Sequence, residues 1–251
     1  MKATERPFQH TRTDGVVLRG RYLPGAGALL VFLSGFRSVH TGQKATAVAA
    51  LAAARGHGCL RFDYLGHGAS DGGFEGFRVS EAVTDAAACI RLVHHPGQRL
   101  VLVGSSMGGW IALELARRGA VAADGLLLIA PALDFVSRRL AAMPADMRAD
   151  LARDGRVRVP DAYTPDTSYP ITRAFLDDAL ALEPGDRALT VPCPVRIVHG
   201  DADDDVPIAT SRRLARRVAG ATLVEIAGGD HRLSDHLPTL LAELDRLLDV
   251  G

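Results

Sequence analysis

The fold is decided by the stretch Leu102-Val103-Gly104-Ser105-Ser106-Met107-Gly108-Gly109-Trp110. An apolar run passes through a Gly-x-Ser-x-Gly pattern into an Ala- and Leu-rich segment, which is typical of a strand, a sharp turn and a helix. The glycines at 104 and 108 permit a tight turn that places Ser106 above a sheet at a helix N-terminus. The pattern predicts that Ser106 is a nucleophile. The alternatives are a glycine turn that only packs a helix on a strand, and Ser105 as the reactive hydroxyl.

Short apolar runs and longer helical patterns alternate along the rest of the chain. The apolar runs, which fit strands buried on both faces, are 29–33, 59–63, 100–103, 126–129 and 195–198. The segments with helical spacing are 43–55, 79–94, 107–118, 208–218 and 237–248. A mixed run at 16–23 is consistent with an opening antiparallel strand or hairpin. This order predicts an α/β fold with a mostly parallel central sheet, in one domain over residues 1–251.

Residues 134–192 interrupt the alternation, because they are rich in Arg, Asp and Pro and contain no run that fits a buried strand. We expect a small helical lid within the domain. Apolar residues recur in it at helical spacing, namely Leu140, Met143, Met147 and Leu151, and a second stripe contains Phe175. Met143, Met147 and Phe175 are predicted to line an apolar acyl pocket. The alternative is that both stripes only pack on the body of the domain.

A serine nucleophile needs a base, and the base needs a carboxylate that orients it. His199-Gly200-Asp201-Ala202-Asp203-Asp204-Asp205-Val206-Pro207 follows the run 195–198, and Gly228-Gly229-Asp230-His231 follows the run 221–227. Parallel strands bring both loops to the edge that carries Ser106. The order Ser, Asp, His therefore predicts a catalytic triad of Ser106, Asp203 and His231. Asp201 and Asp205 remain alternatives to Asp203, as does an acidic turn without a catalytic role.

Backbone N–H groups must also stabilise the negative charge that develops on the substrate oxygen. One candidate is the amide of Met107, directly after the nucleophile. The loop Ser34-Gly35-Phe36-Arg37 follows the run 29–33, and Phe36 is the second candidate. The alternative for this loop is an ordinary glycine turn at a strand end.

Two stretches resemble metal or cofactor motifs but do not match them. Asp201, Asp203 and Asp205 begin like a calcium loop, yet Val206 and Arg212 stand where an EF-hand has Gly and Glu. The glycines that follow the run 59–63 fail a dinucleotide fingerprint, because the third glycine position holds an aspartate. We expect no metal and no cofactor.

The charge balance narrows the possible partners. Lys plus Arg and Asp plus Glu each number 29, so no net field attracts nucleic acid or an anionic membrane. The apolar runs 28–33 and 125–133 are shorter than the about 20 residues of a membrane-spanning helix. Because the first residues lack a secretory h-region and the chain shows no transit peptide, we expect a cytoplasmic protein. The expected partner is a small molecule.

The quoted residues resemble the α/β-hydrolase superfamily over essentially the whole chain. Within it, the chain is similar to the mitochondrial palmitoyl-protein thioesterases that also deacylate acyl glucuronides, and to their bacterial relatives. The similarity rests on the Ser106 stretch, on the two late loops, and on Arg61-Phe62-Asp63-Tyr64-Leu65-Gly66-His67-Gly68-Ala69-Ser70-Asp71-Gly72. It implies an esterase or thioesterase that uses Ser106, Asp203 and His231 without a cofactor. Ser34 departs from the pattern, since many members carry His there.

These observations predict a serine hydrolase that cleaves carboxylic esters or thioesters through an acyl-enzyme. Two other functions stay open. The first is a non-catalytic binding module of the same fold, and the second is the same triad acting on amide, lactone or carbon–carbon bonds.

Overall fold

The computed structural model describes residues 4–161, 164, 166–185 and 188–249. Its centre is an eight-stranded sheet in the order β1-β2-β4-β3-β5-β6-β9-β10. The strands are β1 Arg6–Thr11, β2 Val17–Leu23, β3 Leu29–Leu33, β4 Gly58–Phe62, β5 Leu100–Ser105, β6 Gly125–Ile129, β9 Val195–Gly200 and β10 Thr222–Ile226. Only the pairings of β2 with β1 and with β4 are antiparallel. All other pairs in this sheet are parallel, which confirms the predicted α/β fold.

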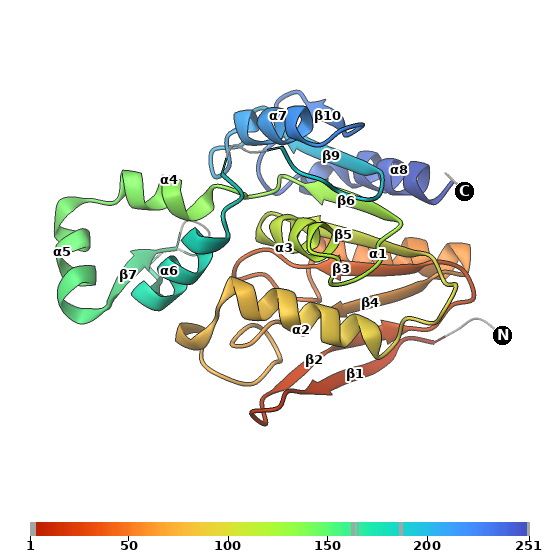
Figure 1. Ribbon diagram of the computed structural model, residues 1–251, viewed down its shortest axis with the longest axis horizontal. Helices are drawn as coiled ribbons and strands as arrows, with labels where there is room; N and C mark the ends of the chain where they lie inside the picture. Colours follow the sequence, from red (N-terminus) through yellow and green to blue (C-terminus); the bar gives the residue numbers. More distant parts are fainter. Residues whose placement is uncertain (1–3, 162–163, 165, 186–187, 250–251) are drawn as a thin grey trace.

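Helices cover both faces of this sheet (Figure 1). One face carries α2 (Val79–Arg91), α3 (Met107–Arg117) and α7 (Ile208–Arg217), and the other carries α1 (Gln43–Arg55) and α8 (Leu237–Leu248). Strand side chains alternate between the two faces. In β3, for example, Val31 joins the core beneath α2 and α3, whereas Leu30 joins the core beneath α1 and α8. Because both faces are covered, the central strands are apolar throughout.

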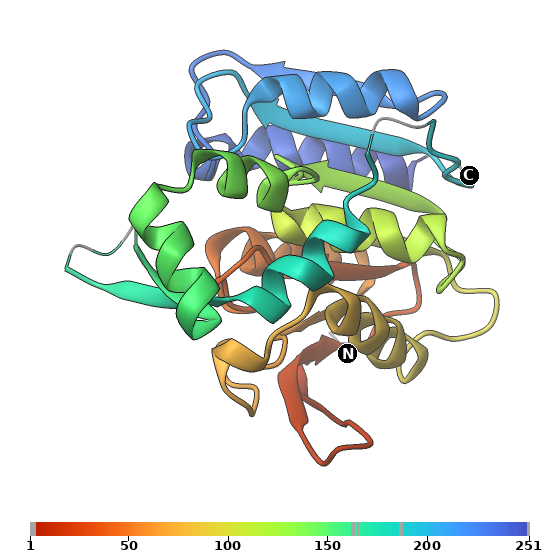
Figure 2. The same cartoon turned by 60° about the vertical axis from the view of Figure 1, so that its left-hand side comes forward.

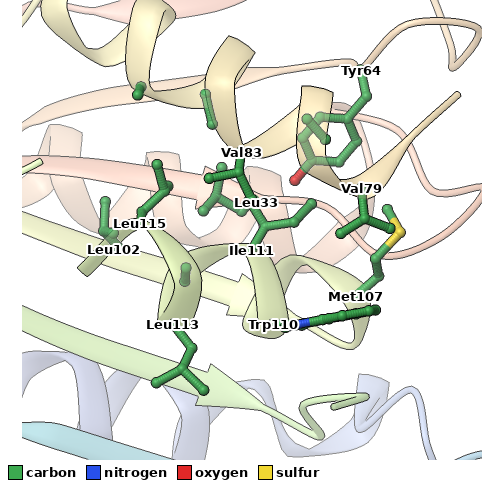
Figure 3. Packing of buried hydrophobic residues seen from close by; sticks show 14 of the residues in the cluster. Leu33, Tyr64, Val79, Val83, Leu102, Met107, Trp110, Ile111, Leu113 and Leu115 are labelled. Carbon is green, nitrogen blue, oxygen red and sulfur yellow. The ribbon is translucent and has the colours of Figure 1, made fainter. Parts of the chain in front are cut away.

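The first turn of α3 is anchored in the larger core (Figure 3). Trp110 and Ile111 are completely buried, and Met107 lies beside Val79 of α2. Truncating a buried aromatic side chain to Ala typically costs about 3–5 kcal/mol. The turn that carries Ser106 is therefore held rigidly against the sheet.

The insertion protrudes from one end of the sheet (Figure 1) and comes forward in Figure 2. It contains α4 (Phe135–Ala142), α5 (Ala145–Asp154), β7 (Arg156–Pro160), β8 (Ser168–Thr172) and α6 (Arg173–Leu182). β7 and β8 form an antiparallel pair. The sequence analysis expected a helical lid, and this pair of strands was not predicted. Val157 is buried between exposed arginines in β7, so this strand alternates in burial as a half-buried strand does.

The apolar stripe predicted along one lid helix is divided between two helices. Leu140 belongs to α4 and Leu151 to α5. Between them, Met143 has extended backbone angles of φ −68° and ψ 128°, and Pro144 follows. A residue that precedes proline is disfavoured in the helical conformation, so the chain turns at this position.

Candidate active site

Ser106 occupies a strained turn between β5 and α3. Its φ is 54° and its ψ is −119°, a conformation that disfavours residues with a side chain. Both flanking glycines are required by close backbone contacts. A Cβ atom on Gly104 would lie 2.2 Å from the carbonyl oxygen of Gly108, and one on Gly108 would lie 2.0 Å from that of Leu33. The turn therefore has the geometry that the Gly-x-Ser-x-Gly pattern predicts.

Three loops at the carboxyl edge of the sheet bring Ser106, His231 and Asp203 together. The Nε2 atom of His231 lies 3.1 Å from Ser106 Oγ, and its Nδ1 atom lies 2.7 Å from Asp203 Oδ2. With Nδ1 donating to the carboxylate, Nε2 can accept the hydroxyl proton of Ser106. This arrangement can transfer a proton away from a serine oxygen.

The Asp203 carboxylate is fully buried and accepts hydrogen bonds on both oxygens. Besides the bond from His231, Oδ2 lies 3.0 Å from His199 Nε2. Oδ1 accepts from the backbone N–H groups of Asp205 at 2.9 Å and Val206 at 2.7 Å. Burial by itself raises the pKa of Asp203, but the hydrogen bonds from His199, His231 and Val206 outweigh it and hold the pKa well below 3.8. Asp203 is therefore ionised at neutral pH.

The neighbouring aspartates have other contacts. Asp201 Oδ1 accepts from the backbone N–H of Gly228 at 2.7 Å, and so ties the two late loops together. The backbone carbonyl of Asp205 accepts from Arg138 at 2.8 Å. Among the three candidates for the triad acid, the contact with His231 is made by Asp203.

His199 is a residue of this site that the sequence analysis did not identify. It is completely buried at the end of β9. Its Nε2 atom also lies 2.8 Å from the carbonyl oxygen of Val206, and its Nδ1 atom lies 2.6 Å from Ser211 Oγ. Because a carboxylate and a carbonyl both face Nε2, this nitrogen carries the proton and Nδ1 accepts from Ser211. A histidine that ends an apolar strand four residues before Asp203 was the available signal.

The loop 34–37 lies directly against Ser106. A Cβ atom on Gly35 would be 3.3 Å from Ser106 Cβ. Within the residues that the structure describes, the N–H groups of Phe36 and Met107 donate to no protein acceptor. Both amides are thus available to an oxygen bound at this site. The hydroxyl of Ser34 is buried and makes no hydrogen bond with another described residue.

An open cavity of about 310 Å³ is lined by residues of α4, α5 and the end of β7, and it reaches the Asp203 loop at Asp205. Met143 and Met147 are among its lining residues. The remaining lining residues are Phe135, Arg138, Arg139, Ala142, Pro144, Val159 and Pro160. Phe175 is placed differently, because its ring stacks on that of Phe36 at 5.3 Å between centroids.

The described part of the chain contains neither a metal-ligand cluster nor a membrane-spanning helix. There, no group of three or more His, Cys, Asp or Glu side chains is placed to hold a metal ion. No helix there has both the length and the apolar character needed to cross a membrane.

Comparison with known proteins relates the whole chain to hydrolases. Residues 30–244 match the model of the alpha/beta hydrolase family. The chain is 31% identical over 246 residues to the mitochondrial palmitoyl-protein thioesterase ABHD10 of Pongo abelii, covering 95% of this chain and 78% of the relative. It is also 31% identical over 181 residues to a monoacylglycerol lipase of Mycolicibacterium smegmatis, covering 62% of this chain and 64% of the lipase.

Solved structures agree with this relationship. A structure named as a hydrolase from Agrobacterium vitis superimposes with a TM-score of 0.90 at 31% identity, covering 98% of this chain and 99% of the other. Alpha/beta hydrolase domain-containing protein 10 from mouse superimposes with a TM-score of 0.85 at 28% identity, covering 97% and 98%.

The expectation of a cytoplasmic protein is contradicted by the ABHD10 thioesterases among these relatives, which are named as mitochondrial proteins. That expectation rested on the absence of a secretory h-region and of a transit peptide, and neither absence establishes a compartment. Because the family model spans residues 30–244 and a relative at 31% identity covers 95% of the chain, the chain belongs to the alpha/beta hydrolase family.

Proposed function

We propose that the protein is a serine hydrolase that cleaves carboxylic esters or thioesters through an acyl-enzyme. The observation that carries this proposal is the chain of contacts from Ser106 Oγ through the His231 ring to Asp203, at 3.1 Å and 2.7 Å. The printed names of the relatives, a palmitoyl-protein thioesterase and a monoacylglycerol lipase, support both thioesters and esters as substrates.

In the first half of the reaction, Ser106 Oγ attacks the carbonyl carbon while its proton passes to His231 Nε2. The carbonyl oxygen becomes an oxyanion that accepts hydrogen bonds from the N–H groups of Phe36 and Met107. Collapse of this intermediate breaks the bond to the leaving oxygen or sulfur, which takes the proton from His231. The products are a free alcohol or thiol and an acyl ester on Ser106.

In the second half, His231 takes a proton from water, and the resulting hydroxide attacks the acyl ester. A second oxyanion forms at the same amides and collapses. The carboxylic acid leaves, and Ser106 recovers its proton from His231. Throughout, the buried Asp203 carboxylate holds the ring orientation and stabilises the imidazolium.

We further propose that residues 134–192 act as a lid on the single domain 1–251, and that Met143 and Met147 bind the acyl chain. Supporting this, both methionines line the cavity that adjoins the loop of Asp203. An acyl chain buried there gains about 0.8 kcal/mol for each CH₂ group.

The test is labelling with a fluorophosphonate probe, followed by turnover of a panel of esters and thioesters. We expect labelling at Ser106, its loss in Ser106→Ala, and turnover of both substrate classes. A folded protein that resists the probe would instead be a non-catalytic binding module. Labelling without ester or thioester turnover would indicate amide, lactone or carbon–carbon bond hydrolysis.

A further inference from the structure

The loop that carries Phe36 is fixed to the body of the domain at its far end. The backbone N–H of His40 donates to Asp63 Oδ1 at 2.6 Å, and the Nδ1 atom of His40 lies 2.7 Å from Asp63 Oδ2. Arg61 donates to the carbonyl oxygen of His40 at 2.5 Å. Asp63 is 1% exposed, and these contacts involve only residues outside the insertion.

Closer to Phe36, the same loop is fixed to the insertion through Arg37. The guanidinium of Arg37 lies 4.2 Å from the ring centroid of Tyr169 in β8. Its Nη1 atom also pairs with Asp161, which directly follows β7, at 2.7 Å. The Asp161 side chain is 6% exposed, so the carboxylate is largely enclosed at this contact. Arg37 thus binds both sides of the β7–β8 hairpin.

Arg37 has an unusual backbone conformation for an arginine. Its φ is 58°, in the left-handed region that glycine adopts freely and that other residues disfavour. The backbone of this turn alone favours glycine. Compared with glycine at this position, the arginine provides side-chain contacts with Tyr169 and Asp161.

The ring of Phe36 lies between the body and the insertion. On the body side its centroid is 5.2 Å from that of Phe74. On the insertion side the corresponding distances are 5.3 Å to Phe175, 5.5 Å to Phe135 and 5.8 Å to Tyr169. The residue proposed to stabilise the oxyanion is therefore held by the insertion through its own ring and through its neighbour Arg37.

We infer that Arg37 and Tyr169 are positioning residues, through which the docked β7–β8 hairpin sets the place of the Phe36 N–H at the oxyanion. This inference rests on the proposed serine-hydrolase function. An oxyanion donor acts only when its N–H is aimed at the position of the developing charge, so small displacements cost rate. The lid then contributes to the chemical step as well as to substrate binding.

Arg37→Gly is the decisive variant, because glycine favours the observed backbone while the contacts with the insertion are lost. We expect kcat to fall by roughly ten- to a hundredfold. The affinity for a tetrahedral adduct former such as a trifluoromethyl ketone should fall in parallel, while that for the product acid stays unchanged. A purely structural contact would alter thermal stability without separating these two affinities.

Changes at Tyr169 test the other side of the contact. Tyr169→Leu removes the ring and should lower kcat as Arg37→Gly does. The double variant should lose less than the two single losses combined, because both single variants remove the contact between Arg37 and Tyr169. Tyr169→Phe keeps the ring under Arg37 and should retain kcat. If Tyr169→Leu fails to fold, the comparison of Tyr169→Phe with Arg37→Gly still tests the inference.

Arg156→Ala is the matched control, since it breaks another ion pair between the insertion and the body. Arg156 pairs with Glu75 at 3.4 Å, and its side chain is 62% exposed. We expect wild-type kcat in this variant. Wild-type kcat and inhibitor affinity in Arg37→Gly would overturn the inference, as would an equal loss in Arg156→Ala. A wild-type protein that hydrolyses no ester or thioester would overturn the proposed function and this inference together.

Discussion

His199 Nε2 lies 3.0 Å from Asp203 Oδ2, the same oxygen that contacts His231 Nδ1 at 2.7 Å. A single carboxylate oxygen thus lies between two imidazole rings, and only the ring of His231 contacts Ser106. His199 is completely buried and holds the carboxylate in place without contacting Ser106.

Replacing His199 by Phe keeps a ring in this position and removes its N–H. A hydrogen bond to a charged group contributes about 1.5–3 kcal/mol, and we expect His199→Phe to lower the free energy of unfolding by that amount. The kcat should fall as well, but less than in Asp203→Asn. Denaturant unfolding and steady-state kinetics check this. Ser211→Ala, which removes only the partner of His199 Nδ1, is the control and should have the smaller effect on both.

The triad residues should differ in how much activity their loss removes. In related chemistry, loss of the nucleophile or base lowers kcat by about 10⁶, whereas an Asp to Asn change costs about 10⁴. We expect that order for Ser106→Ala, His231→Ala and Asp203→Asn. Asp201→Asn keeps an acceptor for Gly228 and should stay near wild type. Collapse of activity in Asp201→Asn, with a normal rate in Asp203→Asn, would assign the acid to Asp201.

The lowered pKa of Asp203 predicts a pH dependence of stability. Its folded-state pKa is depressed below 3.8, so the carboxylate stabilises the fold fully above about pH 4. This contribution is lost as the pH falls further, through the folded-state pKa. Unfolding measured between pH 6 and pH 2 should therefore show a smaller acid-dependent loss in Asp203→Asn than in wild type. Parallel curves for the two proteins would contradict the prediction.

The lid pocket should select substrates by acyl length. Each CH₂ buried at about 0.8 kcal/mol raises kcat/KM about fourfold until the cavity is full. Replacing Met143 and Met147 by Gln should flatten this dependence, because the cavity wall becomes polar. Replacement by Leu preserves volume and apolar character, and should preserve the profile. An unchanged profile in a folded Gln variant would remove the pocket from substrate choice and leave the triad assignment intact.

The sequence predicted the central elements closely because their signals are local. The expected helices at 43–55 and 237–248 have the bounds of α1 and α8, and the run 29–33 those of β3. The run 100–103 was too short, since Gly104 and Ser105 were assigned to the turn. In the structure they continue the pairing of β5 with β6.

Elements at the rim of the molecule were harder to predict. β1 was missed because only Phe8 in it is buried, so the strand has almost no apolar pattern. The hairpin of the insertion was missed because each strand has only five residues and contains a proline, and β7 also contains two arginines.

Among the site residues, the sequence order indicated which residues follow which strand, and that placed Ser106, Asp203 and His231 at one edge. The contacts of His199 with Asp203 and of Arg37 with Tyr169 depend on side-chain directions. The second contact joins residues 132 positions apart in the sequence, which approach each other only after folding, and no sequence periodicity predicts it. The stacking of Phe175 on Phe36 belongs to the same class of contact.

The surroundings of the Asp203 carboxylate disfavour its protonation during the proposed mechanism. Two ring nitrogens and two backbone amides already donate to its oxygens, which occupies the about four lone-pair positions of a carboxylate. Protonating Asp203 means breaking one of these bonds inside a fully buried site. The proton on His231 Nδ1 therefore stays there, and the relay moves a single proton, between Ser106, His231 Nε2 and the leaving group.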